Sequence, residues 1–421
     1  MDSAGLLDLD SALATVLDAA AAATLPAEPL SVGLGALGRV LCVDVVAQGP
    51  VPAFDGSAMD GFAVRSADLD GAGAADPVVL AVIDESRAGA PSNRHLGAGE
   101  AIAISTGAVI PRGADAVIPI EDTIEDTAGD RGEVRCLAPA AAGAWIRRAG
   151  EDIRSGSTVL PRGTRLGPAE LGVLASLGRG EIACARSPSV AVLVTGDELV
   201  GPEEQARAGG VRDSNSLTIP ALARLAGGDI IRVGRLPDDP EATRTGIATA
   251  VEQADMTVIC GGVSVGTHDH VRPALDALGA SRRFWGIALK PGRPTWFGTQ
   301  GTKLIFGLPG NPVSAMVTFT LLAAPALATM LGIPRANRRT TAMLDADYPK
   351  RPGRAHAVRC QLRARDDGLH ALPTGAQGSH ILTSMLGAEA LAMIPAGSAD
   401  VQTGERVVVE PLLPPSLLGF G

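Results

Sequence analysis

Three turns in the middle of the chain carry residues that could hold a phosphate. The glycine-rich run Gly261–Asp269 directly follows the apolar segment Met256–Cys260, and glycines let backbone N–H groups approach an anion closely. Carboxylates follow other apolar segments at Asp197, Glu198 and Asp238. Because parallel strands end at one edge of a sheet, where ligands bind, we expect these acids to converge with Asp269 and Ser264.

Each feature has a simpler explanation when it is taken alone. A glycine-rich turn also forms a tight connection between a strand and a helix, and an acid after a strand also caps a helix or faces solvent. Four acids at the strand ends of one sheet favour a ligand site. Carboxylates repel a phosphate unless a divalent cation lies between them, and hard oxygen ligands favour Mg²⁺. The sequence therefore predicts a magnesium-dependent phosphate site.

Two further loops could contact the same ligand. Lys290–Pro294 carries two cations on a turn stiffened by two prolines and a glycine. Such a basic loop suits an oxyanion, although it could equally be a rigid surface turn. In the turn Gly307–Pro312, Asn311 can cap a helix whose first residue is Pro312.

The order of apolar segments predicts the elements that position these loops. Strand-like and helical segments alternate from Ser189 to Leu331, which predicts a doubly wound, mainly parallel α/β sheet. Short apolar runs separated by Gly, Pro and Asp predict a β-rich insertion before it and a small all-β unit after it. We expect a discontinuous, mixed N-terminal linker domain (1–47 with 150–181), an inserted β-rich domain (48–149), the α/β domain (182–332) and a C-terminal β domain (333–421).

The composition limits the classes of partner. The chain has 421 residues, of which 46% are hydrophobic and 3% aromatic, with 52 Gly and 30 Pro; this predicts several domains rich in turns. A formal net charge of −10 disfavours nucleic acid and anionic membranes as partners. Five widely spaced cysteines without a Cys-x-x-Cys pair argue against a disulfide framework or a zinc site. Since we find no export signal, we expect a cytoplasmic protein.

One stretch could be mistaken for a membrane span. Gly307–Pro334 contains no charged residue and is long enough to cross a bilayer. Its prolines and threonines favour a buried helix that runs from Pro312 toward Leu331.

The motifs also resemble those of a known family, the molybdopterin molybdenumtransferases of the MoeA type, which include the gephyrin E domain. The resemblance covers essentially the whole chain, in order. The matching motifs are Pro52–Val64, Ser105–Ala108, Gly150–Ile153, Thr195–Glu198, Gly261–Asp269, Lys290–Pro294, Pro309–Pro312, Gly378–His380 and Leu382–Met385.

The resemblance implies an elongated homodimer that inserts molybdate into the dithiolene of adenylylated molybdopterin, cleaves the phosphoanhydride and releases AMP. The N-terminal linker domain would take part in dimerisation. A molybdopterin adenylyltransferase and apo-molybdoenzymes are candidate partners. Positions that match catalytic residues of the family are Asp60, Thr106, Asp152, Glu198, Asp238, Asp269 and Lys290.

The family's binding residues also have counterparts. Glu198, Asp238 and Asp269 would hold Mg²⁺ and the pyrophosphate, whereas Asp60 and Thr106 would reach the site from the partner subunit. Positions that match substrate-binding residues are Gly261, Gly262, Ser264, Gly266, Arg293, Pro294, Pro309, Gly310, Asn311, Pro312, Ser314, Arg359 and Ser384. Among these, the molybdate contacts would be Arg293, Pro294, Ser314, Arg359 and Ser384.

The sequence departs from the family pattern at several positions. Gly56 stands where the family commonly has Asn, and Phe62 replaces a frequent Tyr. His270 and Arg272 replace Tyr and Lys, and Arg293 replaces Lys. Both Lys-to-Arg changes keep the charge but exchange a point charge for a planar fork, which could alter the choice between molybdate and tungstate.

Two other functions are compatible with parts of the sequence. The adenylyltransferase that activates molybdopterin with ATP shares the glycine-rich loop and the Pro-Gly-Asn-Pro loop, but the additional domains argue against it. A non-catalytic scaffold is the second alternative, because gephyrin-like proteins also bind receptor tails. The intact set of acids argues against a scaffold.

Overall fold

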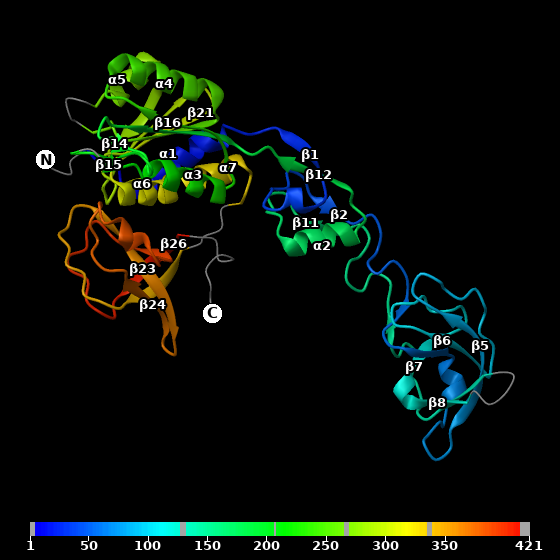
Figure 1. Cartoon of the computed structure of the whole chain (residues 1–421). Helices are drawn as coiled ribbons and strands as arrows, with labels where there is room; N and C mark the ends of the chain where they lie inside the picture. Colours follow the sequence, from blue (N-terminus) through cyan, green and yellow to red (C-terminus); the bar gives the residue numbers. More distant parts are fainter. Residues whose placement is uncertain (1–4, 127–131, 206–207, 265–268, 335–338, 413–421) are drawn as a thin grey trace.

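A computed structural model of the chain describes residues 5–126, 132–205, 208–264, 269–334 and 339–412. Figure 1 shows an elongated molecule. The α/β unit and the C-terminal β unit lie at one end, and the inserted β unit lies at the other. The connection between the two ends consists of short strands and the helix α2 (Pro168–Ser176).

The central sheet has six strands in the order β16-β13-β17-β21-β20-β18. Their bounds are Asp229–Leu236 (β16), Ser189–Thr195 (β13), Met256–Cys260 (β17), Lys303–Leu308 (β21), Trp296–Gln300 (β20) and Ser281–Trp285 (β18). The first four are parallel, and β20 and β18 add an antiparallel edge. β13, β17 and β21 are almost wholly buried, as their continuous apolar runs require when both faces are covered. The predicted doubly wound, mainly parallel sheet is confirmed.

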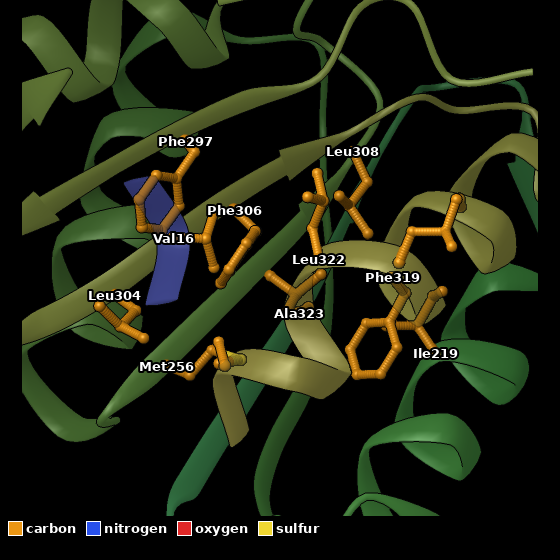
Figure 2. Close-up of a cluster of buried hydrophobic side chains, with 14 of the residues drawn as sticks. Val16, Ile219, Met256, Phe297, Leu304, Phe306, Leu308, Phe319, Leu322 and Ala323 are labelled. Carbon is orange, nitrogen blue, oxygen red and sulfur yellow. The ribbon is translucent and has the colours of Figure 1, made fainter. Parts of the chain in front are cut away.

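Helices cover both faces of this sheet. On one face lie α1 (Leu9–Ala21), α3 (Asn215–Leu225), α6 (Pro312–Thr318), a π-helical turn (Phe319–Ala323) and α7 (Ala324–Met330). On the other face lie α4 (Pro240–Gln253) and α5 (Val271–Ala277). Figure 2 shows the larger core, in which Val16 of α1 lies near Phe297 and Phe306 of the sheet. All five cysteines are free thiols, and four of them are buried.

The uncharged helical segment belongs to this core. Pro312–Met330 spans 19 residues with a mean hydropathy of 1.7, so length and composition alone would allow it to cross a membrane, but 67% of it is buried inside the molecule. Phe319 and Leu322 pack among the sheet residues in Figure 2. Its apolar character is thus explained by contacts within the protein.

The N-terminal helix α1 packs far from the short strands that follow it in sequence. Asp8 caps α1 by accepting from the backbone N–H of Ser11 over 2.9 Å. Leu13 and Val16 are buried in the core that α7 also lines. Burial of each such side chain stabilises the fold by roughly 1.5–3 kcal/mol. The start of the chain therefore contributes to the core of the α/β unit.

The connecting region is built from two strand pairs and α2. β1 (Ala27–Ser31) pairs with β12 (Glu181–Ala185), and β2 (Val45–Val46) pairs with β11 (Thr158–Leu160). A 3-10 turn, Leu34–Ala36, precedes β2. The chain therefore leaves the α/β unit and returns to it through adjacent strands, as a discontinuous segment requires. The domain boundaries given above stay a prediction.

The inserted unit is a six-stranded sheet in the order β7-β4-β6-β5-β9-β8. Its strands are β4 (Gly61–Val64), β5 (Val78–Ser86), β6 (Glu100–Ile104), β7 (Ala116–Pro119), β8 (Thr123–Asp126) and β9 (Glu133–Cys136), with 3-10 turns at Ser66–Leu69 and Ile120–Asp122. A separate pair, β3 (Gly56–Ser57) with β10 (Ile146–Arg147), lies at the entrance to this unit.

The C-terminal unit is a closed β structure. Its strands are β19 (Leu289–Lys290), β22 (Thr340–Leu344), β23 (Ala355–Arg365), β24 (Gly368–Pro373), β25 (Ala390–Ile394) and β26 (Arg406–Pro411). β23 pairs with both β24 and β25, and the order β23-β24-β22-β26-β25 therefore returns to β23. β19 comes from the α/β unit and pairs in parallel with β23. Closure leaves few free strand edges, which stabilises a small β unit.

A histidine between two acids makes the stability of the β unit depend on pH. His370 Nδ1 lies 2.6 Å from an Asp345 oxygen, and Nε2 lies 2.9 Å from an Asp367 oxygen. Its hydrogen bond to Asp345 and then that to Asp367 raise the pKa of His370. Because the pKa in the folded state exceeds the unfolded value, the stabilisation is complete below about pH 6.5 and is lost as pH rises through the raised pKa.

We expect His370→Asn to lower the melting temperature more at acidic than at alkaline pH. The difference from the wild type should shrink as pH rises above about 6.5, because the wild-type imidazole then loses its charge. Thermal unfolding at a series of pH values measures this difference. His380→Asn, at an exposed histidine of the same unit, is the control, and a His370 difference that is constant with pH contradicts the explanation.

Candidate functional site

The turns after four parallel strands lie at one edge of the central sheet. β13, β16, β17 and β21 run in the same direction, so their carboxyl ends share that edge. The backbone N–H of Asp197 donates to the Asp238 carboxylate over 3.2 Å, and the N–H of Asp238 donates to the Asp197 carboxylate over 3.2 Å. This reciprocal pair joins the acidic turns after β13 and β16.

Glu198 lies in the same turn as Asp197. Its carboxylate occupies the space beside Gly196, where an added Cβ would lie 2.5 Å from Glu198 Oε2. Gly196 has a φ of 137°, which only glycine adopts readily. Glu198 begins the short pair β14 (Leu199–Val200) with β15 (Val211–Arg212), because its carbonyl accepts from the N–H of Val211 over 2.8 Å. The exposed carboxylate is thus held at the edge of the sheet.

The glycine-rich turn packs closely against its neighbours. A Cβ on Gly261 would lie 2.7 Å from Thr195 Oγ1, and a Cβ on Gly310 would lie 3.6 Å from the Cα of Gly261. The side chain of Asn215, in the first turn of α3, donates to the Gly310 carbonyl over 2.8 Å. The backbone after β17 therefore lies against the last residue of β13 and against the backbone after β21.

Several predicted contacts belong to these turns, and one lies outside the described residues. Gly262, Pro309 and Pro312 flank the residues just described, Ser264 is exposed, and Asp269 is half-buried immediately before α5. Gly266 falls outside the described residues. In the part of the chain that the structure describes, no three His, Cys, Asp or Glu side chains form a group able to hold a metal ion. The role of Glu198, Asp238 and Asp269 as metal ligands therefore stays a prediction.

An aromatic side chain and a cation hold the end of the described glycine-rich turn. Trp285 Nε1 donates to the Val263 carbonyl over 2.9 Å, and Arg272 donates to the Ser264 carbonyl over 3.2 Å. The Arg272 guanidinium lies 4.3 Å from the centre of the Trp285 ring, which is worth about 0.5–1 kcal/mol at a partly exposed position. Arg272, which stands where the family has Lys, thus contacts Trp285 of β18.

We expect Arg272→Ala to expose the Trp285 ring. Acrylamide quenching of tryptophan fluorescence should increase, because the guanidinium no longer covers the indole. The measurement belongs in a Trp145→Phe background, since Trp145 is 50% exposed and Trp296 only 1% exposed. Arg282→Ala, at an exposed position of the same strand, controls for loss of charge. Quenching equal to that of the control contradicts the role of Arg272.

The basic loop Lys290–Pro294 joins the α/β unit to the C-terminal β unit. β19 contains Lys290, whose Cα faces that of His356 in the parallel pairing with β23. Lys290 is exposed, whereas Arg293 and Pro294 are half-buried. The Arg293 carbonyl accepts from the N–H groups of Ile287 and Thr295 over 3.0 and 2.9 Å. These bonds hold the loop in shape, and the pairing of β19 with β23 places it beside the C-terminal unit.

A buried arginine lies on β23, three residues after this contact. Arg359 is 1% exposed, and its guanidinium donates to Ser384 Oγ over 3.1 and 3.0 Å and to the Gly378 carbonyl over 3.2 Å. Within the described ranges, no carboxylate forms an ion pair with it. Burial lowers the pKa of Arg359, because desolvation disfavours its charge. A buried cation bonded only to neutral oxygens favours an anionic ligand.

The Pro-Gly-Asn-Pro turn connects this arginine to the edge of the sheet. Asn311 Nδ2 donates to Ser379 Oγ over 3.2 Å, and Ser379 follows the Gly378 whose carbonyl Arg359 contacts. Ser314 is buried in the first turn of α6, which contacts the 3-10 turn Leu382–Met385 that contains Ser384. The structure thus brings two of the predicted oxyanion residues, Arg359 and Ser384, into contact and packs the helix that carries Ser314 against the turn of Ser384.

The predicted start of α6 is confirmed in position, but not in the hydrogen bond expected of its cap. Asn311 occupies the N-cap position of α6, but its side chain makes no capping hydrogen bond. The amide instead bonds Ser379 of the C-terminal unit. A contact between two units, absent from any local sequence signal, replaces the local cap.

Three predicted catalytic residues, Asp60, Thr106 and Asp152, lie outside the α/β unit. The backbone N–H of Thr106 donates to Asp60 over 2.7 Å, so these two residues lie together. Asp152 is exposed in the connecting region, where its N–H donates to the Val51 carbonyl over 3.1 Å. Figure 1 places the inserted sheet, which Asp60 and Thr106 adjoin, at the opposite end of the molecule from β13 and β21. One chain alone does not bring them to the strand ends.

Sequence reasoning missed three contributors to this region. Asn215 and Trp285 act through hydrogen bonds to carbonyls of distant turns, for which no local pattern exists. Lys350–Arg354 is a second loop that combines a lysine, a Pro-Gly pair and an arginine, as Lys290–Arg293 does. That repeated pattern could have drawn attention to it.

Comparison with known proteins gives consistent matches along the chain. The model of the MoeA N-terminal region (domain I and II) matches residues 7–178. A probable molybdopterin binding domain matches residues 191–329, and the MoeA C-terminal region (domain IV) matches residues 341–412.

Individual relatives and structures are similar over most of their length. A molybdopterin molybdenumtransferase of Haemophilus influenzae is 35% identical over 379 residues, which are 89% of this chain and 92% of that protein. The enzyme of the same name from Bacillus subtilis is 34% identical and covers 89% of this chain and 87% of its own length. The crystal structure of a molybdopterin biosynthesis MoeA protein from Pyrococcus horikoshii has a TM-score of 0.80 at 31% identity, covering 96% and 99% of the two chains.

Proposed function

This chain belongs to the molybdopterin molybdenumtransferase (MoeA) family, and from that premise we propose that it inserts molybdate into adenylylated molybdopterin and releases AMP. In this reaction two Mo–S bonds would form while one molybdate oxygen leaves as water with the two thiol protons, and a water molecule would cleave the phosphoanhydride bond to give AMP and the phosphate monoester of the cofactor. The substrates are thus a tetrahedral oxyanion and a pterin nucleotide with a pyrophosphate. A transferase role in molybdenum cofactor biosynthesis agrees with the relatives of that name.

The buried guanidinium of Arg359 is the observation that carries this proposal. Its neutral partners leave its charge without an anion among the described residues. Ser384 is buried in contact with it, and Ser314 is buried on α6, which packs against the turn of Ser384. Hydroxyl and guanidinium donors in a desolvated place bind a tetrahedral oxyanion well. Arg293 and Pro294 approach from the loop that β19 fixes to β23. Molybdate would therefore lie where these donors meet.

The pterin nucleotide would lie along the edge of the sheet. The backbones of Gly261, Gly262 and Gly310 approach each other closely there, and Ser264 is exposed beside them. Exposed backbone N–H groups of such turns bind phosphate oxygens. Lys290 adds positive charge from the neighbouring loop. A pyrophosphate held this way would place the dithiolene toward Arg359.

The donor set at this edge fits Mg²⁺. Mg²⁺ keeps several waters and binds through one or two carboxylates together with substrate phosphates, so it does not need a preformed protein cage. The Asp197–Asp238 pair and the exposed Glu198 supply carboxylate oxygens next to the phosphate turns. Glu198, Asp238 and Asp269 would hold the ion. When bound, Mg²⁺ would neutralise phosphate charge and polarise the bridging bond.

We also propose that the active site is shared between the subunits of a homodimer. Asp60 and Thr106 lie together but at the far end of this chain, so they can act on the same substrate only from a second copy. Asp152, in the connecting region, would act with them. The reaction would take place in the cytoplasm, with a molybdopterin adenylyltransferase as supplier and apo-molybdoenzymes as acceptors.

We expect Arg359→Gln to lower molybdate-dependent AMP release roughly 10- to 100-fold, as loss of a charged hydrogen-bond donor does. The assay supplies adenylylated molybdopterin, molybdate and Mg²⁺ and measures AMP by chromatography. Arg363→Gln, exposed on the same strand, is the matched control. AMP release equal to that of the control contradicts the oxyanion role. Consumption of Mg-ATP by the wild type would indicate the adenylyltransferase instead, and no turnover at all would indicate a scaffold.

Mixed dimers test the shared site. Asp60→Ala and Asp238→Asn should each be inactive alone, because each would damage both sites of a homodimer. Random mixing gives one intact site in half of the dimers, so activity should return to about a quarter of the wild-type level. Co-expression of two differently tagged chains followed by the AMP assay measures it. No recovery in purified mixed dimers contradicts a site built from two subunits.

A further inference from the structure

A tryptophan at the entrance to the inserted unit is exposed on an unusual stretch of backbone. Trp145 is 50% exposed, and its φ is 54°. Among the described residues, it is the one residue other than glycine with a positive φ. Left-handed backbone brings Cβ close to the next carbonyl, so Gly or Asn is favoured there. A large aromatic ring kept at such a position indicates a functional constraint.

Backbone hydrogen bonds on both sides of Trp145 hold this conformation. The N–H of Val117 donates to the Ala144 carbonyl over 3.0 Å, and the N–H of Ala58 donates to the Trp145 carbonyl over 2.8 Å. The next residue begins β10, which pairs with β3. The surrounding chain thus fixes the backbone, and half of the side chain stays in contact with solvent.

Trp145 lies near the two residues that would reach the substrate from the partner subunit. The Asp60 carboxylate accepts from the N–H of Thr106 over 2.7 Å. β3 pairs with β10 on one side, and on its other side the Ser57 carbonyl accepts from the N–H of Gly107 over 2.8 Å. Since neighbouring strands are about 4.8 Å apart, the backbones of β10 and of Gly107 lie roughly 10 Å apart. One pterin nucleotide is long enough to contact both.

The exposed ring has a face available for a ligand. Within the described ranges, no aromatic ring or cation stacks on Trp145. Single exposed apolar side chains are common, but left-handed backbone would carry a small polar residue at lower cost. Indole rings stack well on flat heteroaromatic rings, and such stacking tolerates different ring types. The substrate of the proposed reaction carries two rings of this kind, a pterin and an adenine.

We propose that Trp145 is a stacking surface for a flat heteroaromatic ring of the substrate that the partner subunit holds. The inserted unit lies at the opposite end of its own chain from the strand ends (Figure 1), so the ring meets a substrate bound to a second copy. Trp145 binds and orients the substrate, while Asp60 and Thr106 act beside it. This inference rests on the proposed function, including a site shared between subunits.

Equilibrium dialysis of two probes, AMP and 6-hydroxymethylpterin, against the full-length protein tests the stacking. Trp145→Asn removes the ring but suits the backbone, so affinity for at least one probe should fall about fivefold or more. Its melting temperature should stay the same or rise, because Asn tolerates a positive φ. Trp145→Phe keeps a ring and should retain part of the affinity. Val79→Asn, 49% exposed on β5 of the same unit, is the matched control.

The two probes distinguish the rings of the substrate. A loss of affinity for AMP alone supports stacking on adenine, and a loss for 6-hydroxymethylpterin alone supports stacking on the pterin. Unchanged affinity for both overturns the proposal. A lower melting temperature of Trp145→Asn also overturns it, because the ring would then stabilise the fold instead of serving a ligand.

Kinetics of purified mixed dimers test on which subunit the ring acts. As a homodimer, Trp145→Asn should raise KM for adenylylated molybdopterin more than it lowers kcat, as loss of a binding contact does. Paired with an Asp238→Asn chain, it should show the wild-type KM, because the one active site then takes its ring from the other chain. Both substitutions in one chain, paired with a wild-type chain, should show the raised KM.

The opposite assignment of KM values would overturn the role of Trp145 across subunits. The wild-type KM in every variant would overturn the inference while the proposed function stands. Absence of molybdate-dependent AMP release by the wild type would instead refute the proposed function.

Discussion

A buried guanidinium that has no carboxylate partner among the residues the structure describes is the interaction on which this site depends. Arg359 is held by Ser384 and the Gly378 carbonyl, and both are neutral acceptors that fix its orientation without cancelling its charge. A charge kept in a desolvated place destabilises a protein unless something opposite meets it. Under the function proposed above, an anionic substrate would supply that opposite charge each time it binds, and the cost of the unpaired charge would be recovered as affinity for the substrate.

Two contacts between the α/β unit and the C-terminal β unit determine what surrounds the charge of Arg359. β19 leaves the α/β unit and pairs with β23 of the β unit, while Asn311 bonds Ser379 across the same boundary. These two contacts place the loop Lys290–Pro294 and the first turn of α6 beside Arg359. In the α/β unit, β13, β16, β17 and β21 are parallel, so the acidic and glycine-rich turns that follow them lie at one edge of the sheet. These contacts therefore connect the surroundings of Arg359 with the turns at which we propose that Mg²⁺ and the phosphates bind.

The sequence predicts the elements with strong local signals well. β13 and β17 are continuous apolar runs because helices cover both faces of their sheet, and this run length is visible without a structure. The edge strand β18 was not predicted, because Ser281, Arg282 and Arg283 are polar and exposed and show no strand-like pattern. They form a strand by pairing with β20. Likewise, Asn311 could be assigned only a local cap. Its bond to Ser379, 68 residues later in the sequence, depends on the packing of two units.

Anomalous diffraction at the molybdenum edge, from crystals soaked in molybdate, tests the central claim most directly. The account predicts a peak within hydrogen-bonding distance of the Arg359 guanidinium and Ser384 Oγ in the wild type, and its disappearance in Arg359→Gln. Occupancy of molybdate elsewhere on the protein, with no peak at Arg359, would contradict the account.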